Sequence, residues 1–190
     1  MSLDIVMGPM FAGKSSHILQ IISRHAAIGT SVYVIKHGYD TRYAYSEENI
    51  VTHDGRLARC VTTTNLFHPT VLAMIKDIKV IIVDEAQFFH DLVAFVHQVV
   101  EIMGKQLYLV GLDGDSNRQP FGDILQCIPL ADRIHKLTAF CKVCADGTPA
   151  LFTKRLSGVS DQQVIVGGKE IYTSVCRPCY LRQSLEDPRA

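Results

Sequence analysis

Short apolar runs alternate with amphipathic stretches over about the first 140 residues of the chain. Runs of strand length occupy residues 3–7, 32–36, 59–61, 80–83 and 107–110. The run Val80-Ile-Ile-Val83 is apolar on both faces, which indicates a central strand that is covered on both sides. Helical patterns are expected in residues 15–27, 69–76, 92–103 and 129–135. Because strands that alternate with helices are typical of a parallel sheet, the sequence predicts an α/β fold.

Two segments depart from this alternation. Residues 37–55 are polar, contain three tyrosines and predict a long loop. After Phe140 the chain carries short β-like pieces, glycine pairs and four cysteines. We therefore expect an α/β nucleotide-binding domain over residues 1–140 and a small cysteine-bearing domain over residues 141–190.

The string Gly-Pro-Met-Phe-Ala-Gly-Lys-Ser stands between the first predicted strand and the first predicted helix. It fits the phosphate-binding loop G-x-x-x-x-G-K-[ST], in the strand–loop–helix context that this motif needs. Lys14 can reach the β- and γ-phosphates of a nucleotide, and the Ser15 hydroxyl can ligate Mg²⁺. A glycine turn before an ordinary helix is the alternative, but the context favours nucleotide binding. The nucleotide-binding residues expected here are Gly8, Pro9, Met10, Phe11, Ala12, Gly13, Lys14 and Ser15.

Two acids, Asp84 and Glu85, follow the central apolar run in the Walker B arrangement. Asp84 is expected to help hold the Mg²⁺ ion, and Glu85 is then available as a general base. If Glu85 deprotonates water the protein is an ATPase, and if it deprotonates a substrate hydroxyl the protein is a kinase. The string Asp84-Glu85-Ala86-Gln87 also resembles the box of helicases, which need two such domains and a basic track. The length of 190 residues and the formal net charge of zero favour a small-molecule kinase.

Two Cys-x-x-Cys pairs, Cys141 with Cys144 and Cys176 with Cys179, predict a fully ligated, structural Zn²⁺ site. Disulfides or a redox pair are the competing interpretations, and a zinc-ribbon binding module is a further alternative for the whole chain. The sequence shows no secretory signal and no apolar run of ~18 residues. We therefore expect a cytoplasmic protein with neither a membrane nor a nucleic-acid partner.

Together these motifs resemble the type II thymidine kinase family of vertebrate cytosolic and poxvirus enzymes. The other strings that carry the resemblance are Asp40-Thr-Arg42-Tyr43, Gly111-Leu-Asp-Gly114, Arg118, Pro120-Phe-Gly122, Thr153-Lys-Arg155, Gly167-Gly168 and Tyr172-x-Ser-Val-Cys-Arg-x-Cys179. The resemblance implies a RecA-like domain with a zinc-anchored lasso. It implies phosphoryl transfer from ATP to the 5′-hydroxyl of thymidine, with Mg²⁺. It also implies a homotetramer, feedback inhibition by dTTP and a cytoplasmic location.

The resemblance also assigns roles to single residues. Glu85 would accept the hydroxyl proton, while Lys14, Arg42 and Mg²⁺ would stabilise charge on the transferring group. Further nucleotide-binding residues implied are Asp40, Thr41, Arg42, Asp84, Glu85, Ala86 and Gln87. Substrate-binding residues implied are Met10, Phe88, Leu112, Ser116, Phe121, Thr153, Arg155, Gln163, Val164, Ile165, Val166, Gly167 and Tyr172. Ser116 stands where the family carries an aromatic residue, so we expect a roomier nucleoside pocket.

Overall fold

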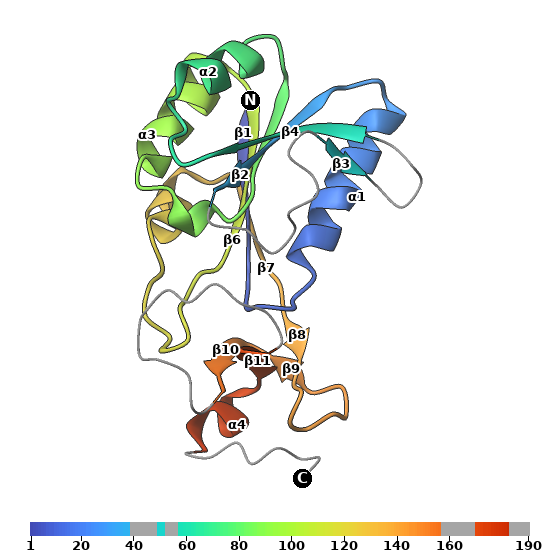
Figure 1. The fold of residues 1–190 in the computed structure, drawn as a ribbon, viewed down its shortest axis with the longest axis vertical. Helices are drawn as coiled ribbons and strands as arrows, with labels where there is room; N and C mark the ends of the chain where they lie inside the picture. The colour runs from blue at the N-terminus through green and yellow to red at the C-terminus, as the bar shows by residue number, and fades with distance from the viewer. Residues whose placement is uncertain (39–48, 52–56, 157–169, 183–190) are drawn as a thin grey trace.

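The computed structural model describes residues 1–38, 49–51, 57–156 and 170–182. Its upper part in Figure 1 is a seven-stranded sheet with the order β3-β4-β2-β5-β6-β1-β7. The parallel strands are β1 (Ser2–Met7), β2 (Val32–His37), β4 (Leu57–Thr63), β5 (Val80–Val83), β6 (Gln106–Gly111) and β7 (Arg133–Lys136). Strand β3 (Asn49–Val51) pairs antiparallel with β4 at one edge. The predicted α/β fold with a parallel central sheet is confirmed.

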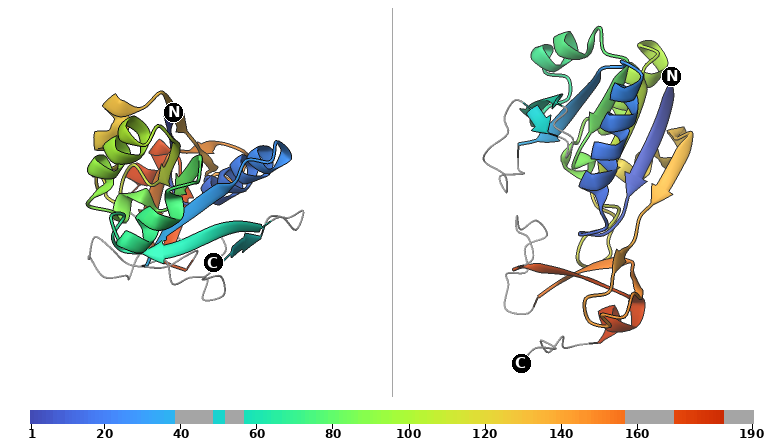
Figure 2. Two further views of the ribbon diagram at one scale, coloured as in Figure 1. Left: turned by 90° about the horizontal axis from the view of Figure 1, so that it is seen from above. Right: turned by 90° about the vertical axis from the view of Figure 1, so that its right-hand side faces the viewer.

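Helices cover both faces of the sheet. Helix α1 (Lys14–Ala27) lies on one face, whereas α2 (Pro69–Ile75), α3 (Leu92–Val96) and the π-helix η2 (His97–Ile102) lie on the other (Figures 1 and 2). Helix α1 packs three isoleucines at helical spacing, Ile18, Ile21 and Ile22, against alternate residues of the strands such as Val34. The other residues of these strands, Ile35 among them, pack toward α2 and α3. This double burial is what the apolar run of β5 predicts, and β5 lies inside the sheet between β2 and β6.

Two predictions of local structure are wrong. The helix predicted for residues 129–135 is instead the end of a 3-10 helix, η3 (Ile124–Leu130), followed by strand β7. Strand β7 is an edge strand whose four residues are all exposed, so it lacks the buried apolar face that identifies a strand. The loop predicted for residues 37–55 contains strand β3, and residues 39–48 and 52–56 lie outside the described residues.

A smaller lobe lies beyond the carboxyl ends of the parallel strands (Figure 1). It contains β8 (Ala139–Phe140), β9 (Pro149–Ala150), β10 (Phe152–Arg155), β11 (Tyr172–Val175) and α4 (Arg177–Leu181). Strand β8 pairs with β9, and β10 pairs with β11, both antiparallel. The domain boundary near residue 140 stays a prediction, and this change of architecture is compatible with it. Across the described ranges, no helix is both long and apolar enough to cross a membrane.

Candidate active site

The residues with predicted chemistry gather where the parallel strands end. In the sheet, β6 separates β5 from β1, and the three strands point the same way. The phosphate loop follows β1, the acid pair Asp84–Glu85 follows β5, and Gly111 ends β6. The N–H of Gly8 donates to the carbonyl oxygen of Gly111 at 3.3 Å, which joins two of these strand ends. Open α/β sheets bind their ligands outside such carboxyl ends, so this edge is the candidate active site.

The phosphate loop has the curled backbone that its glycines predict. Gly13 caps the N-terminus of α1 with φ 81° and ψ 21°, and Phe11 also has a positive φ of 65°. Gly8 lies so close to Leu137, the residue that follows β7, that a Cβ atom on Gly8 would come within 2.6 Å of the Leu137 carbonyl oxygen. The loop therefore presents backbone N–H groups and the positive end of α1 on one side, a combination that binds phosphate.

Lys14 of this loop reaches back over it. Its Nζ atom donates to the carbonyl oxygens of Gly8 at 3.1 Å and Pro9 at 2.9 Å. These contacts hold the ammonium group at the mouth of the curled backbone. A phosphate bound in the loop would exchange neutral carbonyl acceptors for charged oxygens, with which an ammonium group forms the stronger hydrogen bond.

The acid pair is held in an unusual backbone conformation. The N–H of Asp84 donates to the Ile35 carbonyl oxygen of β2 at 2.8 Å, which continues the sheet by one residue. Glu85 then turns into the left-handed region, with φ 52° and ψ 43°, and its N–H donates to Asp84 Oδ1 at 2.9 Å. A residue other than glycine pays about 1–3 kcal/mol in such a conformation, which persists mainly at functional sites. The strain supports a functional role for the Glu85 carboxylate.

Gln87 connects the acid pair to β6. Its side chain is 2% exposed; Nε2 donates to Glu85 Oε2 at 2.7 Å, and Oε1 accepts from the N–H of Leu112 at 2.9 Å. Because the Gln87 amide is also bonded to the backbone of Leu112, it fixes the orientation of the Glu85 carboxylate. The sequence predicts Gln87 at the site through the family resemblance, but this bridge depends on contacts between β5 and β6 that no local pattern records.

Two glycines leave room for Gln87. A Cβ atom on Gly111 would collide with Gln87 Oε1, and one on Gly122 would collide with the Gln87 carbonyl group. Gly122 also has a positive φ of 59°. The close approach of the backbone to Gln87 therefore requires glycine at both positions.

Gly122→Ala is expected to lower the free energy of unfolding by about 3 kcal/mol or more, because backbone strain and a backbone clash act together. Gly104→Ala is the matched control, since Gly104 has a similar φ of 67° but no heavy atom within 4 Å of the added Cβ. It should cost only about 1 kcal/mol. Urea unfolding of both variants measures the difference, and equal losses would contradict the clash.

An aromatic cluster lies beside the acid pair. Phe88 packs edge-to-face against Phe121, with ring centroids 5.4 Å apart and an interplanar angle of 84°. The His37 ring lies 5.4 Å from Phe88 and 4.7 Å from Phe89. The structure thus brings two predicted substrate residues, Phe88 and Phe121, together. The sequence analysis missed His37, although a polar residue at the end of an apolar strand on the carboxyl edge is a usable signal.

His37 is buried, and burial lowers its pKa below the ordinary value of 6.5. His90 lowers the pKa further, whereas Asp91 and Glu85 act in the opposite direction. Below about pH 6.5 the unfolded chain therefore binds the proton more readily than the folded chain, and stability is lost as the pH falls.

His37→Phe keeps a ring against Phe88 and Phe89 but cannot titrate. We expect its stability to fall less steeply between pH 7 and pH 5, by up to about 1.4 kcal/mol per pH unit for one proton. Chemical unfolding at several pH values gives the slope, and an unchanged slope would show that His37 does not contribute to it.

The small lobe reaches the phosphate loop directly. The N–H of Met10 donates to Thr153 Oγ1 at 2.9 Å, and Thr153 is 5% exposed. On the same hairpin, Arg155 pairs with Tyr172, with its guanidinium carbon 5.8 Å from the Tyr172 ring centroid. These three predicted residues of the lobe therefore come from one two-stranded unit. Other predicted residues lie outside the described part of the chain: Asp40, Thr41, Arg42, Gln163, Val164, Ile165, Val166 and Gly167.

The four cysteines of the two pairs come together in the small lobe. Their Sγ atoms all lie within 4.8 Å of one another, and Cys144 Sγ lies 3.7 Å from Cys176 and 3.6 Å from Cys179. Tetrahedral coordination with a zinc–sulfur bond of ~2.3 Å places sulfurs ~3.8 Å apart, so the spacing fits such an ion. A disulfide requires ~2.05 Å, and these distances do not fit one.

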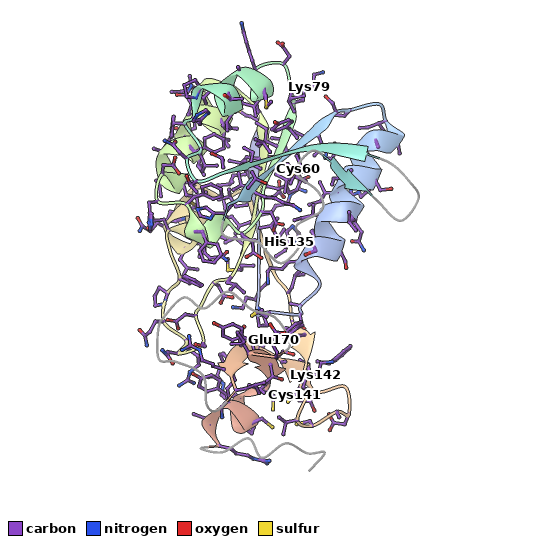
Figure 3. All side chains as sticks on the ribbon, viewed as in Figure 1. Cys60, Lys79, His135, Cys141, Lys142 and Glu170 are labelled. Carbon is purple, nitrogen blue, oxygen red and sulfur yellow. The ribbon has the colours of Figure 1, made fainter. Side chains whose placement is uncertain are left out.

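Local hydrogen bonds favour a thiolate at Cys141, whereas hydrogen bonds with Cys179, Cys141 and Cys176 raise the pKa of the Cys144 thiol to about 12. Burial raises the pKa of the Cys141 thiol, but backbone N–H groups of Cys144, Cys176 and Val143 outweigh burial and lower the pKa to about 6. The thiolate is the form that binds metal. Cys141 lies in the lower lobe in Figure 3, far from Cys60, which packs in the core of the sheet domain. Cys127 likewise packs in the core.

A phosphate loop after one strand of a parallel sheet and a Walker B acid pair after another define a phosphate-loop nucleotide-binding enzyme. A sequence profile of thymidine kinases matches residues 1–180. Thymidine kinase a of Arabidopsis thaliana is 40% identical over 183 residues, 95% of this chain and 75% of the plant protein. The thymidine kinase of sheeppox virus (strain KS-1) is 37% identical over 178 residues, which cover 94% of this chain and 96% of the viral protein. The chain belongs to the thymidine kinase family.

Proposed function

We propose that this protein transfers the γ-phosphoryl group of ATP to the 5′-hydroxyl of thymidine, with Glu85 as the general base. The observation that carries the proposal is the position of Glu85 at the same sheet edge as the phosphate loop. Its backbone is strained, and Gln87 holds its carboxylate. Membership of the thymidine kinase family favours this reaction over the alternative of a nucleic-acid motor.

Each residue at the edge has a task in this reaction. The backbone N–H groups of the phosphate loop and Lys14 bind the β- and γ-phosphates, and Ser15 and Asp84 hold Mg²⁺. Bound Mg²⁺ neutralises charge on the phosphates. Glu85 accepts the proton of the attacking hydroxyl, and Gln87 holds the carboxylate at the required angle. Arg42 is proposed to stabilise the transferring group, with Asp40 and Thr41 beside it.

The small lobe is proposed to cover the nucleoside and to exclude water, because water would otherwise accept the phosphoryl group. Phe88, Leu112, Phe121 and Tyr172 form the walls of the pocket, and residues 163–167 meet the base edge. The four cysteines hold a structural zinc ion, for which their spacing is suited. Assembly as a homotetramer, feedback inhibition by dTTP and a cytoplasmic location are further parts of the proposal.

Ser116→Phe tests how the pocket wall sets selectivity. The Ser116 side chain is half-buried on the loop that follows β6. Phenylalanine there should narrow the pocket and lower kcat/KM for bulky 5-substituted nucleosides by about tenfold relative to thymidine, the scale of one hydrophobic contact. Kinetics across a series of analogues measures the ranking, and an unchanged ranking would remove Ser116 from the pocket wall.

The reaction is tested by ADP release from purified protein with Mg²⁺-ATP, with and without thymidine. Thymidine-dependent turnover with formation of thymidine monophosphate is the expected result. Turnover that ignores thymidine but rises with added nucleic acid would overturn the proposal and favour the motor. Turnover with neither addition would indicate a simple nucleotide hydrolase.

A further inference from the structure

The loop between β6 and η3 forms one side of the candidate site. It leaves the sheet at Leu112, whose N–H is bound to Gln87, and returns at Phe121, whose ring packs on Phe88. Ser116 lies midway along this stretch. Both ends of the loop are therefore fixed to the segment that follows Glu85.

The middle of the loop is a closed turn. Buried Asp115 accepts at Oδ1 from the N–H groups of Asn117 and Gln119 at 2.8 and 2.9 Å. Its own N–H donates to the Gln119 carbonyl oxygen, and its carbonyl oxygen accepts from the N–H of Arg118, both at 3.0 Å. Arg118 has a positive φ of 62° within this turn. These bonds make the turn rigid, but none of them fixes its position relative to the rest of the protein.

Tyr180 of helix α4 ties the turn to the small lobe, while the ion pair between Lys136 and Asp113 ties the start of the loop to β7. The Tyr180 hydroxyl donates to the Ser116 carbonyl oxygen at 2.7 Å, across 64 residues of sequence. The Arg118 guanidinium carbon lies 4.3 Å from the centroid of the same ring, within the range of a cation–π contact. Tyr180 therefore contacts the turn twice, through its hydroxyl group and through the face of its ring.

The Tyr180 ring is itself held firmly. Tyr180 directly follows Cys179 of the four-cysteine cluster, and the backbone N–H of Tyr180 donates to the Cys176 carbonyl oxygen at 2.9 Å. Lys154 Nζ donates to the Tyr180 carbonyl oxygen at 3.0 Å, and Phe152 packs on the ring at 5.4 Å. Strand β10 thus braces Tyr180, and the Thr153 of this strand also contacts the phosphate loop.

We propose that Tyr180 is a positioning residue that sets the width of the nucleoside side of the site, together with Arg118. It transmits the position of the four-cysteine lobe to the Ser116 turn. This inference rests on the proposed function, since it names the side of the site that receives the nucleoside. The phosphate loop is contacted by the same lobe through a different hydrogen bond, from the N–H of Met10 to Thr153 Oγ1.

Tyr180→Phe removes the hydroxyl and keeps the ring. Loss of one such hydrogen bond is expected to raise KM for thymidine about 3–10-fold, with KM for ATP and kcat within about twofold of the wild type. Hydrogen exchange of residues 112–122, measured without substrate, should become severalfold faster. Tyr108→Phe is the matched control, because it also removes one bonded hydroxyl, which accepts from Gln106 Nε2 at 2.8 Å on β6. Tyr108→Phe should change neither KM for thymidine nor the hydrogen exchange of residues 112–122.

Arg118→Gln is the second variant, and it lies outside the metal-binding lobe. Arg118→Gln should also raise KM for thymidine and speed hydrogen exchange of residues 112–122. The variant that carries both substitutions should show less than the sum of the two single effects. Unchanged exchange in both variants, or a rise in KM for ATP equal to that for thymidine, would overturn the inference. A wild-type protein that does not phosphorylate thymidine would refute the proposed function, while the exchange experiment would still decide whether Tyr180 holds the turn.

Discussion

Glu85→Gln is expected to lower kcat for thymidine phosphorylation by about 10²–10⁴-fold, the range for removal of a general base. The amide has the size of the carboxylate and keeps an oxygen that can accept from Gln87 Nε2. It cannot take the proton of the attacking hydroxyl. The phosphate loop is unchanged, so KM for ATP should stay within about threefold.

Glu101→Gln is the matched control for this variant. Glu101 lies on η2, its side chain is 60% exposed, and it pairs with His97 at 2.9 Å. The control removes the same charge from the protein and should leave turnover unchanged. Steady-state kinetics with both substrates measures the split between kcat and KM. A Glu85→Gln enzyme with more than about a third of wild-type kcat would show that another group accepts the proton.

The sequence predicts most of the sheet because the signals are local. The phosphate loop marks the end of β1 and the start of α1, and the four apolar residues of β5 coincide with the observed strand. These motifs also place Lys14 and Glu85 at one edge, since parallel strands end together. Two Cys-x-x-Cys pairs likewise predict a cluster, because each pair can place two sulfurs on one ion.

The sequence does not predict features that depend on distant partners. Strand β7 is exposed along its length and forms only because β1 offers a free edge for hydrogen bonding. Gln87 bridges two strand ends, and the bond from Tyr180 to Ser116 spans 64 residues. Such contacts are properties of the folded arrangement. They hold the groups of the site at defined angles. The sequence therefore predicts which residues carry the chemistry, but not the contacts that orient them.

Loss of one metal ligand is expected to have the second large effect. Among the described residues, the buried apolar core of the small lobe has six members, of which three are cysteines: Ala139, Cys141, Ala150, Val175, Cys176 and Cys179. Only a few partly buried apolar side chains, such as Phe152, pack against it. So small a core cannot stabilise a lobe by apolar burial alone. Structural zinc contributes on the order of 10 kcal/mol to the folding of comparable small domains. Most of the stability of the lobe should therefore come from the ion.

Cys176→Ser is expected to abolish metal binding and to lower thymidine kinase activity by ~100-fold or more, on the premise that the ion supplies most of the lobe's folding energy. Without the ion, the lobe cannot keep Thr153 on Met10 or Tyr180 on Ser116, and both sides of the site lose their support. Cys60→Ser is the matched control, since Cys60 is buried in the sheet domain outside the cluster. It should keep one metal ion per chain and most of the activity.

Elemental analysis of the purified proteins distinguishes the interpretations of the cysteines. We expect one zinc ion per wild-type chain, loss of activity on treatment with a strong chelator, and recovery when Zn²⁺ is returned. Mild reductants should have no effect, because sulfurs 3.6–3.7 Å apart are not joined by a disulfide. Inactivation by reductant instead of chelator would assign the cluster to disulfides. Activity that survives loss of the metal would show that the sheet domain positions the nucleoside without the small lobe.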